Sequence, residues 1–574
     1  ILARAIRSDS VIHGIPFDNI HVKQILYADD MSVFVQDIES FNRLNSLFTS
    51  FADMSGLKMN RDKTFVLLLG PNADKDVIVP FGKIVNIVKI LGIQFTLDVE
   101  SQTKINYKEI LSKIKKLLMW WKQRDLTLMG KIQLIKTFVL SKLVYVSSLT
   151  PVPPWAFREI EVLIFDFLWN GKDKIKRSTM FLDYDKGGLK LTDFQLFIRT
   201  QRIMWMKRLI TGDSNMIWKR YFKYLTRKYG GLLIFFSNVS PDLLALSLPD
   251  FYRSMLEAWL GTKAFLLKNE ISKRNQIIYN NRCIRIQGQI CFHEDLFLKN
   301  VFKIHHIVDK KGELKSITEF KKMGLNNIEI NIIKQLYEGI PFSWKPLLNI
   351  YEHPCEDTEL SLEFIINGNP HSLQGITSKY IYSTLLKMRT DKPYATCNLE
   401  RTYNMVENDT RTIFLRPRKS TLDRKLREFQ YKMLYNLIYT NKHLYTFKHA
   451  VSNLCSFCNK HEETYEHLFF TCEKVANIWK DCGDLFSLSA LKNLHWQEIH
   501  IGIKRSNAGE EQLLNHIILL TKHMIFKYSS TQNRPPIPQE IKKRIIENRQ
   551  EEKELAGERG TLTLHFRKWD NFHS

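Results

Sequence analysis

The spacing of apolar positions changes along the chain and separates a mixed α/β start from a mostly helical remainder. The runs "QILY" (24–27) and "MSVF" (31–34) have strand length and predict a hairpin. Asp37 can cap a following helix with four apolar residues on one face: Phe41, Leu44, Phe48 and Phe51. Two more strands are predicted in 64–70 and 88–95. Residues 1–100 are therefore expected to form an α+β domain.

Helical spacing dominates from about residue 106. The segment 106–125 carries Lys and Arg around an apolar seam, in which Trp120 and Trp121 are expected to be core residues. The segment 415–439 predicts a strongly basic amphipathic helix, and the charged stretch 537–560 predicts a solvated helix. We therefore expect a mostly α-helical body after the first domain.

The composition indicates a globular protein with a polyanionic partner. Of the 574 residues, 44% are hydrophobic and 25% are charged. The formal net charge of +24 favours nucleic acid, although a merely basic soluble protein is the alternative. We expect no membrane partner, because no apolar run approaches the ~20 residues of a span. The first residue is Ile and no signal peptide is evident, so a fragment of an intracellular protein is expected.

Two adjacent carboxylates, Asp29 and Asp30, fall between the two runs of the predicted hairpin. Carboxylates held this close favour a cationic neighbour. Phosphoryl-transfer enzymes use such groups to hold two metal ions, and Mg²⁺ or Mn²⁺ suits a site of carboxylates, water and phosphate oxygens. The alternative is an ordinary turn, where Asp is common.

Three of the eight cysteines cluster near a histidine. Cys455 and Cys458 are separated by two residues, and His467 and Cys472 follow after eight and four more. Three thiolates and one imidazole suit tetrahedral Zn²⁺, and a site with four protein ligands is structural. His461 is the second choice for the imidazole ligand. The alternative is a set of small buried cysteines beside a surface histidine.

The tetrapeptide Tyr27-Ala28-Asp29-Asp30 resembles the central catalytic motif of reverse transcriptases. "GLKMNRDKT" (56–64) and "KILGIQF" (89–95) are similar to the next two motifs of LINE-type (non-LTR) retrotransposon polymerases. The likeness continues through "DKGGLKLTDF" and the Cys/His cluster, in the family's order. The chain therefore resembles the C-terminal portion of such a protein.

This resemblance implies an RNA-directed DNA polymerase. Asp29 and Asp30 would hold Mg²⁺ or Mn²⁺, Lys63 would be the general acid, and Tyr27 and Gly92 would lie near the primer end. Template RNA, target DNA and deoxynucleotides would be its partners, in a cytoplasmic ribonucleoprotein and the nucleus. Each role has a plainer alternative: a strand aromatic for Tyr27, a solvated lysine for Lys63 and a strand bulge for Gly92.

The family also has a third metal-binding Asp and a Gly-rich segment, which we expect to lie before residue 1. We therefore expect residues 1–574 to be inactive alone. The rival interpretations are a non-catalytic nucleic-acid-binding relic and a viral RNA-copying polymerase, and "LREFQYKMLYN" argues against the viral one. The expected domains are a partial palm, a thumb, a connector of unclear role, a basic helix with a zinc-binding module, and a charged helical tail: 1–100, 101–215, 216–410, 411–490 and 491–574.

Overall fold

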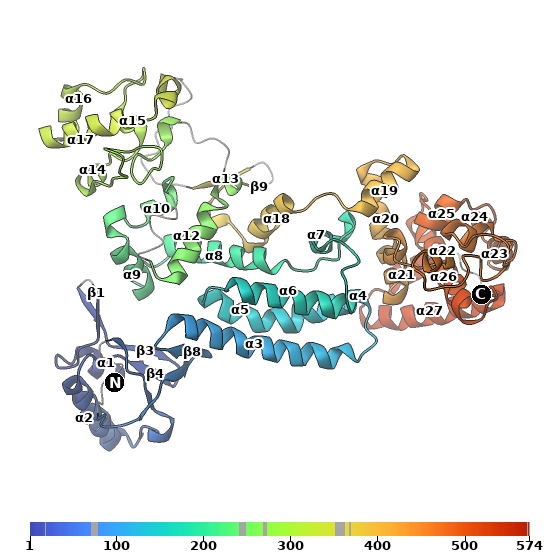
Figure 1. Ribbon diagram of the computed structural model, residues 1–574, viewed down its shortest axis with the longest axis horizontal. Helices are drawn as coiled ribbons and strands as arrows, with labels where there is room; N and C mark the ends of the chain where they lie inside the picture. The colour runs from blue at the N-terminus through green and yellow to red at the C-terminus, as the bar shows by residue number, and fades with distance from the viewer. Residues whose placement is uncertain are drawn as a thin grey trace. The chain divides into compact units, whose positions relative to one another are not determined.

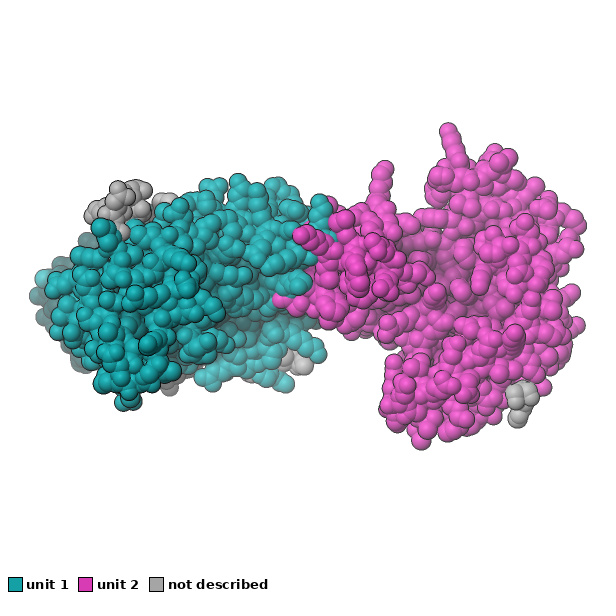
Figure 2. Space-filling view, turned by 90° about the horizontal axis from the view of Figure 1, so that it is seen from below, with its two compact units in different colours: residues 1–115, 142–160, 194–387 teal, residues 116–141, 161–193, 388–574 magenta. Residues whose placement is uncertain are grey.

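The computed structural model is mostly helical, with a few short strands (Figure 1). The chain divides into two compact units, which Figure 2 colours separately. Unit 1 comprises 1–115, 142–160 and 194–387, and unit 2 comprises 116–141, 161–193 and 388–574. Both units are therefore discontinuous in sequence. The structure describes 1–17, 19–70, 78–239, 248–267, 273–349, 362–366, 369–570 and 572.

Unit 1 begins with the predicted hairpin and helix. The helix α2 (Ile38–Ser55) starts where the Asp37 carboxylate accepts a hydrogen bond from the Ser40 N–H at 2.6 Å, and it ends at Gly56 with a φ of 71°. Its buried residues Phe41 and Leu44 form a small core. The preceding elements are α1 (Leu2–Ser8), β1 (Ile15–Phe17), β2 (Ile20–Val22), β3 (Gln24–Tyr27) and β4 (Asp30–Val33).

The strands form separate two-stranded ladders rather than one sheet in the described part of the chain. The ladders β1–β2, β3–β4 and β7–β8 are antiparallel, and β5–β6 is parallel. The described part of the N-terminal region is thus α+β, as predicted, and the assignment of residues 1–100 to a partial palm stays a prediction. The remaining strands of this region are β5 (Phe65–Val66), β6 (Lys83–Ile84), β7 (Ile87–Ile90) and β8 (Ile93–Thr96).

The predicted helical region follows. In unit 1 the Tyr107 hydroxyl of α3 donates to the carbonyl of Thr150, the residue after α5, at 3.3 Å. Our expectation that Trp120 is a core residue is wrong, because this side chain is 56% exposed. The helices of this region are α3 (Val99–Lys122), α4 (Leu128–Leu134), a π-helical turn η3 (Ile135–Val139), α5 (Leu140–Leu149), α6 (Pro154–Trp169), α7 (Arg177–Phe181), η4 (Tyr184–Lys186) and α8 (Phe194–Ile210).

One continuous helical stretch in the described residues, Leu128–Leu149, has the length and composition of a membrane span, with a mean hydropathy of 1.3. This stretch contradicts the expectation that no apolar run approaches the length of a span. Core helices of proteins that fold in water have the same length and composition, and Ile135, Val139 and Leu143 of this stretch are fully buried. A single stretch of this kind therefore does not establish a membrane span.

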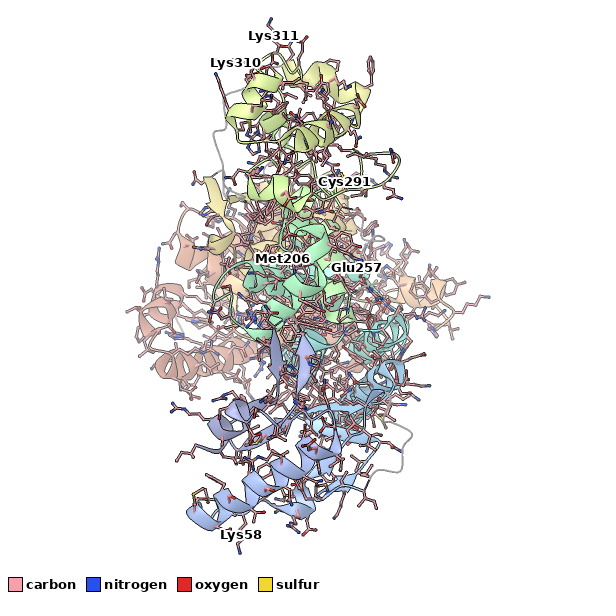
Figure 3. All side chains as sticks on the ribbon, turned by 90° about the vertical axis from the view of Figure 1, so that its left-hand side faces the viewer. Lys58, Met206, Glu257, Cys291, Lys310 and Lys311 are labelled. Carbon is pink, nitrogen blue, oxygen red and sulfur yellow. The ribbon has the colours of Figure 1, made fainter. Side chains whose placement is uncertain are left out.

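The rest of unit 1 is built on two cores. In the first, α8 packs against α12 (Asp250–Leu260), and Met206 of α8 is fully buried. The second core comprises Leu233 and apolar residues between Ile277 and Leu348. Figure 3 labels Met206 and Glu257 on α8 and α12, and Lys310 and Lys311 in the stretch that forms the second core. The other elements are α9 (Ile217–Leu225), η5 (Arg227–Tyr229), α10 (Leu233–Phe236), α13 (Lys263–Leu266), η6 (Lys273–Asn275), α14 (Glu294–Leu298), α15 (Ile304–Ile307), α16 (Ile317–Lys322), α17 (Asn327–Glu338), η7 (Phe342–Asn349), β9 (Glu363–Ile366), β10 (Asn369–Ser372), η8 (Leu373–Gly375) and α18 (Ser378–Arg389).

The C-terminal part of unit 2 is helical, but the single helix predicted for 415–439 is wrong. Instead α20 (Glu407–Ser420) ends, and Asp423 caps a separate helix α21 (Arg424–Leu434) by accepting from the Lys425 N–H at 2.7 Å. The further helices are α19 (Tyr394–Tyr403), α22 (Asn441–Thr446), η9 (His467–Thr471), α23 (Ile478–Leu485), α24 (Ser489–Lys492), α25 (Trp496–Ile501), α26 (Ala508–Thr531), α27 (Pro538–Glu558) and α28 (Leu562–Trp569).

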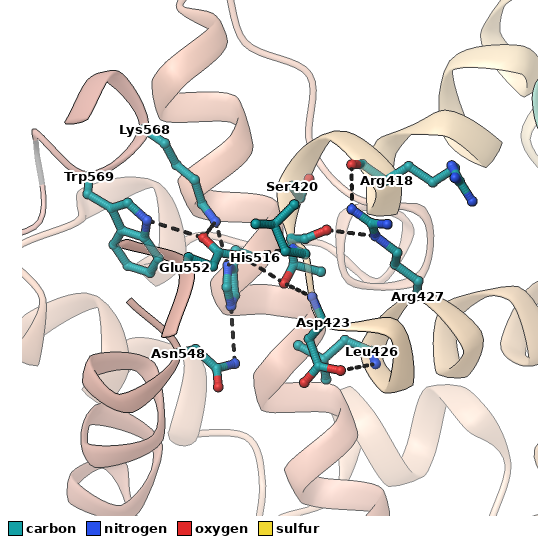
Figure 4. Close-up of polar contacts among 12 residues, drawn as sticks. Arg418, Ser420, Asp423, Leu426, Arg427, His516, Asn548, Glu552, Lys568 and Trp569 are labelled. Atoms are coloured by element: carbon teal, nitrogen blue, oxygen red, sulfur yellow. Dashed lines mark hydrogen bonds and ion pairs between the residues drawn. The ribbon is translucent and has the colours of Figure 1, made fainter. Parts of the chain in front are cut away.

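The charged helix α27 is present as predicted, but one of its faces is buried. On that face, Glu552 accepts hydrogen bonds from Lys568 Nζ at 2.6 Å, the Leu422 N–H at 2.9 Å and Trp569 Nε1 at 3.3 Å (Figure 4). Lys568 Nζ also donates to His516 Nδ1 at 2.7 Å. Glu552, Lys568 and His516 are all buried. This network ties α26, α27 and α28 to the loop between α20 and α21.

Candidate functional site

The structure brings the four predicted zinc ligands together. The donor atoms of Cys455, Cys458, His467 and Cys472 all lie within 4.8 Å of one another. The Sγ atoms of Cys455 and Cys472 are 3.8 Å apart, and Cys458 Sγ is 3.4 Å from His467 Nε2. Zinc bound tetrahedrally by sulfur at ~2.3 Å and nitrogen at ~2.0 Å requires edges of about 3.8 Å and 3.5 Å. The cluster is therefore compatible with Zn²⁺.

Two local structures produce this arrangement. The first is a tight turn at Cys455–Cys458, in which the Phe457 N–H points at Cys455 Sγ at 3.5 Å. The second is the π-helical turn η9, which ends where the Cys472 N–H donates to the His467 carbonyl at 3.0 Å. In a regular α-helix, residues five apart lie about 140° apart around the axis. The wider π-helical turn, followed by the extended backbone of Cys472, brings the side chains of His467 and Cys472 together.

The electrostatics of the cluster favour a cation. Burial raises the pKa of the Cys455 thiol to about 12 and also raises the pKa of Cys472. Burial also opposes ionisation of Cys458, but hydrogen bonds from the backbone N–H groups of Lys460 and His461 outweigh it and lower its pKa. Three thiolates this close repel one another, so a bound divalent cation is needed to hold them ionised.

His467 has an environment typical of a metal ligand. Its Nδ1 lies 3.4 Å from the Thr471 hydroxyl, so the second ring nitrogen is held by a protein group. Burial lowers the pKa of His467, which favours the neutral imidazole that binds metals. His461, the second choice from the sequence, lies outside the four-donor cluster, and its ring centroid is 5.4 Å from that of His467.

Glu463 supports the cluster and was missed by the sequence analysis. Its carboxylate is 2% exposed and accepts hydrogen bonds from the Ser456 N–H at 2.7 Å, the Ser456 hydroxyl at 2.6 Å and the Asn441 N–H at 2.8 Å. It therefore joins the Cys455–Cys458 turn to the start of α22. A charged residue between two cysteines in the sequence gives no signal of burial, because its partners lie seven and 22 residues away.

The cluster is part of the large core of unit 2. Cys455 and Cys472 are fully buried with residues of α21, α23 and α26, and Trp569 of α28 belongs to the same core. The indole N–H of Trp479 donates to the Phe469 carbonyl in the π-helical turn at 2.9 Å. The metal cluster and the last three helices thus share one packed interior.

Comparisons with known proteins agree with this geometry. Residues 398–479, which contain all four donors, match the family described as zinc-binding in reverse transcriptase. Over 91% of its length the chain is also 21% identical to the "Transposon TX1 uncharacterized 149 kDa protein" of Xenopus laevis. Residues 398–479 are therefore similar to a zinc-binding segment of reverse transcriptases, and most of the chain is similar to a transposon protein. The chain spans 43% of the length of the Xenopus laevis protein.

The second candidate site is the hairpin β3–β4. Tyr27 pairs with Asp30 across the ladder, and Ala28 and Asp29 form the two-residue turn. Ala28 has a φ of 51°, an uncommon conformation for a residue with a Cβ. Both aspartates are exposed at the tip, as predicted. Among the described residues, no third His, Cys, Asp or Glu joins them in a group that could hold a metal.

The other predicted residues lie on separate turns. Lys63 ends the short helix η1 (Arg61–Lys63), which Asn60 caps, and no contact between Lys63 and the aspartate pair is found within the described residues. Gly92 has a φ of 87° and Leu91 a φ of 46°, so they form the type I′ turn of β7–β8. Gly92 therefore shapes a hairpin rather than a bulge. The Tyr145 hydroxyl secures this turn by donating to the Leu91 carbonyl at 2.5 Å.

Proposed function

We propose that this chain is part of the RNA-directed DNA polymerase of a non-LTR retrotransposon. The observation that carries the proposal is the exposed hairpin with Tyr27, Asp29 and Asp30 at its tip, in a chain whose residues 398–479 match a reverse-transcriptase zinc-binding family. Such an enzyme extends a DNA 3′ end along an RNA template. Template RNA, target DNA and deoxynucleotides are its proposed partners, and a cytoplasmic ribonucleoprotein and the nucleus are its proposed locations.

In this proposal Asp29 and Asp30 hold Mg²⁺ or Mn²⁺, which would position the attacking and leaving oxygens when bound. Their exposure leaves room for water and phosphate oxygens as further ligands. Lys63 would protonate the departing pyrophosphate, and Tyr27 and Gly92 would lie near the primer end. Because no third donor joins the pair among the described residues, we expect residues 1–574 alone not to extend a primer.

Primer extension on an RNA template with Mg²⁺ tests whether residues 1–574 alone are inactive. No incorporation is expected from residues 1–574. Incorporation that disappears in Asp29→Asn would contradict the expected inactivity and would support the polymerase assignment.

A non-catalytic nucleic-acid-binding relic is the second candidate, favoured by the incomplete carboxylate set. Electron paramagnetic resonance of Mn²⁺ with a primer–template duplex and a deoxynucleotide separates the two. A signal of protein-bound Mn²⁺ that is lost in Asp29→Asn and retained in Asp53→Asn supports the polymerase. Asp53 is the control because it is an exposed carboxylate of α2 outside the hairpin. No Mn²⁺ bound at the pair would favour the relic.

Nucleic-acid binding is common to both candidates, and the formal charge of +24 supports it. Only some of the basic residues in the predicted segment 415–439 are available for phosphate contacts. Arg416 is buried and donates to the Ile501 carbonyl at 2.6 Å, and Arg427 donates to the Thr421 carbonyl at 2.7 Å. Affinity should fall steeply between about 50 and 200 mM salt, and a flat salt dependence would refute charge-driven binding.

A further inference from the structure

Trp120 is unusually exposed for a tryptophan, which has the largest side chain of all residues. It is 56% exposed near the end of α3, whereas none of the other ten tryptophans, all of which lie in described parts of the chain, is among the exposed large hydrophobic residues. The adjacent Met119 is 60% exposed, and Phe138 of η3 is 44% exposed. These residues of unit 2 therefore place apolar surface in solvent, which commonly marks an interaction site.

The exposed ring is supported from one side. Trp121 is half-buried, and its ring lies 5.4 Å from that of Trp120 at an interplanar angle of 86°. Trp121 also stacks on Phe138 with centroids 6.3 Å apart and an angle of 27°. Because the two indole rings are perpendicular, Trp121 does not stack in parallel on Trp120. Trp120, Trp121 and Phe138 are called the aromatic platform below.

The charges around the aromatic platform are mainly positive. The Arg124 guanidinium lies 5.3 Å from the centre of the Trp120 ring, and Lys116 is exposed one helical turn earlier. Neither cation has a carboxylate within ion-pair distance in the described residues. Lys122 is paired with Asp166 at 3.0 Å, so it contributes less. An anionic partner with flat apolar groups fits such a surface better than a neutral protein face does.

We propose that the aromatic platform binds an unpaired base of a single-stranded nucleic acid, with Trp120 stacking on the base and Lys116 and Arg124 meeting the flanking phosphates. This inference rests on the proposed nucleic-acid binding and names one of its contact sites. Stacking of bases on aromatic rings tolerates any sequence, because every base has a π-face. Duplexes bury their base faces, so the platform prefers single strands.

Affinity of the full chain for a single-stranded oligonucleotide tests the proposal. Trp120→Ala should weaken binding about 5- to 150-fold, the range for one stacked base, and Trp120→Phe should recover part of the loss. The salt dependence should be unchanged in both variants. Lys116→Gln should instead reduce the slope of log affinity against log salt by about 0.7, because one phosphate contact is lost.

Two controls separate stacking from other causes. Phe342→Ala removes an 87% exposed aromatic from unit 1 and should leave the affinity unchanged. An oligonucleotide of the same length with abasic sites should bind wild type and Trp120→Ala equally. Equal weakening with and without bases would overturn the proposal.

Unchanged binding by Trp120→Ala would also overturn the proposal while leaving nucleic-acid binding intact. Conversion of a wild-type dimer into a monomer by that variant would assign the platform to a second copy. No binding by the wild-type chain at low salt would overturn both this inference and the proposed function.

Discussion

Replacing Glu552 by Gln should destabilise the C-terminal part of unit 2 by about 3 kcal/mol. Burial alone would raise the pKa of Glu552. In the acid range where this carboxyl titrates, the positive charges of protonated His516 and of Lys568 and the hydrogen bonds from Lys568 and Leu422 outweigh burial and lower the pKa from 4.5 to about 2. A lowering of this size corresponds to roughly 3 kcal/mol. Burial lowers the pKa of His516 to about 3, so the imidazole is neutral at neutral pH and Lys568 is the counter-charge.

The variant leaves the Lys568 ammonium buried without its carboxylate, which typically costs about 3–5 kcal/mol. The intact pair contributes less than this, because burial also lowers the pKa of Lys568, to about 8. A double variant in which Lys568→Met accompanies Glu552→Gln should therefore be more stable than the sum of the two single losses predicts. Hydrogen exchange of the α27 and α28 amides in increasing urea measures the local free energy of opening.

The pH dependence gives a second readout. The folded-state pKa of Glu552 lies below its unfolded value, so its contribution is present above about pH 4.5 and is lost as the pH falls towards about 2. Glu547→Gln is the control on the same helix, because Glu547 pairs with Arg544 at 2.8 Å on the surface and should contribute at most about 1 kcal/mol. A Glu552→Gln loss no larger than the Glu547→Gln loss, or one that persists unchanged at pH 2.5, would refute the reasoning.

Two further predictions concern the turn before α8 and the metal cluster. Gly187→Ala should destabilise unit 2 by about 2–4 kcal/mol, because the φ of Gly187 is +78° and an added Cβ would lie 2.8 Å from the Tyr435 hydroxyl. Gly560→Ala is the control: Gly560 has a φ of +65°, but no atom lies within 4 Å of an added Cβ, so the variant should cost only about 1–2 kcal/mol. Thermal unfolding with equal losses in both would contradict this. Metal analysis of the full chain should find about one Zn²⁺, lost in Cys458→Ser and retained in Cys482→Ala, a buried cysteine outside the cluster; retention in both would refute the ligand set.

The local elements were predictable where the chain itself carries the signal. Two short apolar runs of strand length with Asp29 and Asp30 between them predicted β3–β4, and Asp37 predicted the start of α2. The four donors of the metal cluster could be predicted because the ligand chemistry restricts their types and spacing. The φ of 51° at Ala28 was not predictable, because Ala has no preference for that conformation.

The predictions that were wrong concern features that depend on tertiary contacts. The apolar spacing continues across the end of α20, so 415–439 was interpreted as one helix, although Asp423 before Arg424 is a capping signal. Trp120 was assigned to the core by its size, and no local pattern shows that the core lies on the other side of α3. The burial of Glu552 and Glu463 depends on partners from other helices and loops, which a charged sequence does not reveal.

The discontinuity of unit 2 has a consequence for the order in which the protein can fold during synthesis. Segments 116–141 and 161–193 leave the ribosome before residues 194–387, and their packing partners in 388–574 follow only afterwards. At about 5–20 residues per second, the intervening stretch of about 190 residues takes roughly 10–40 s to synthesise. During that interval the surfaces of those segments that pack against 388–574 in the finished unit lack their native partners; α4, for example, packs against α21. The nascent chain should therefore depend on a holding chaperone more strongly than a protein whose domains are completed one after another.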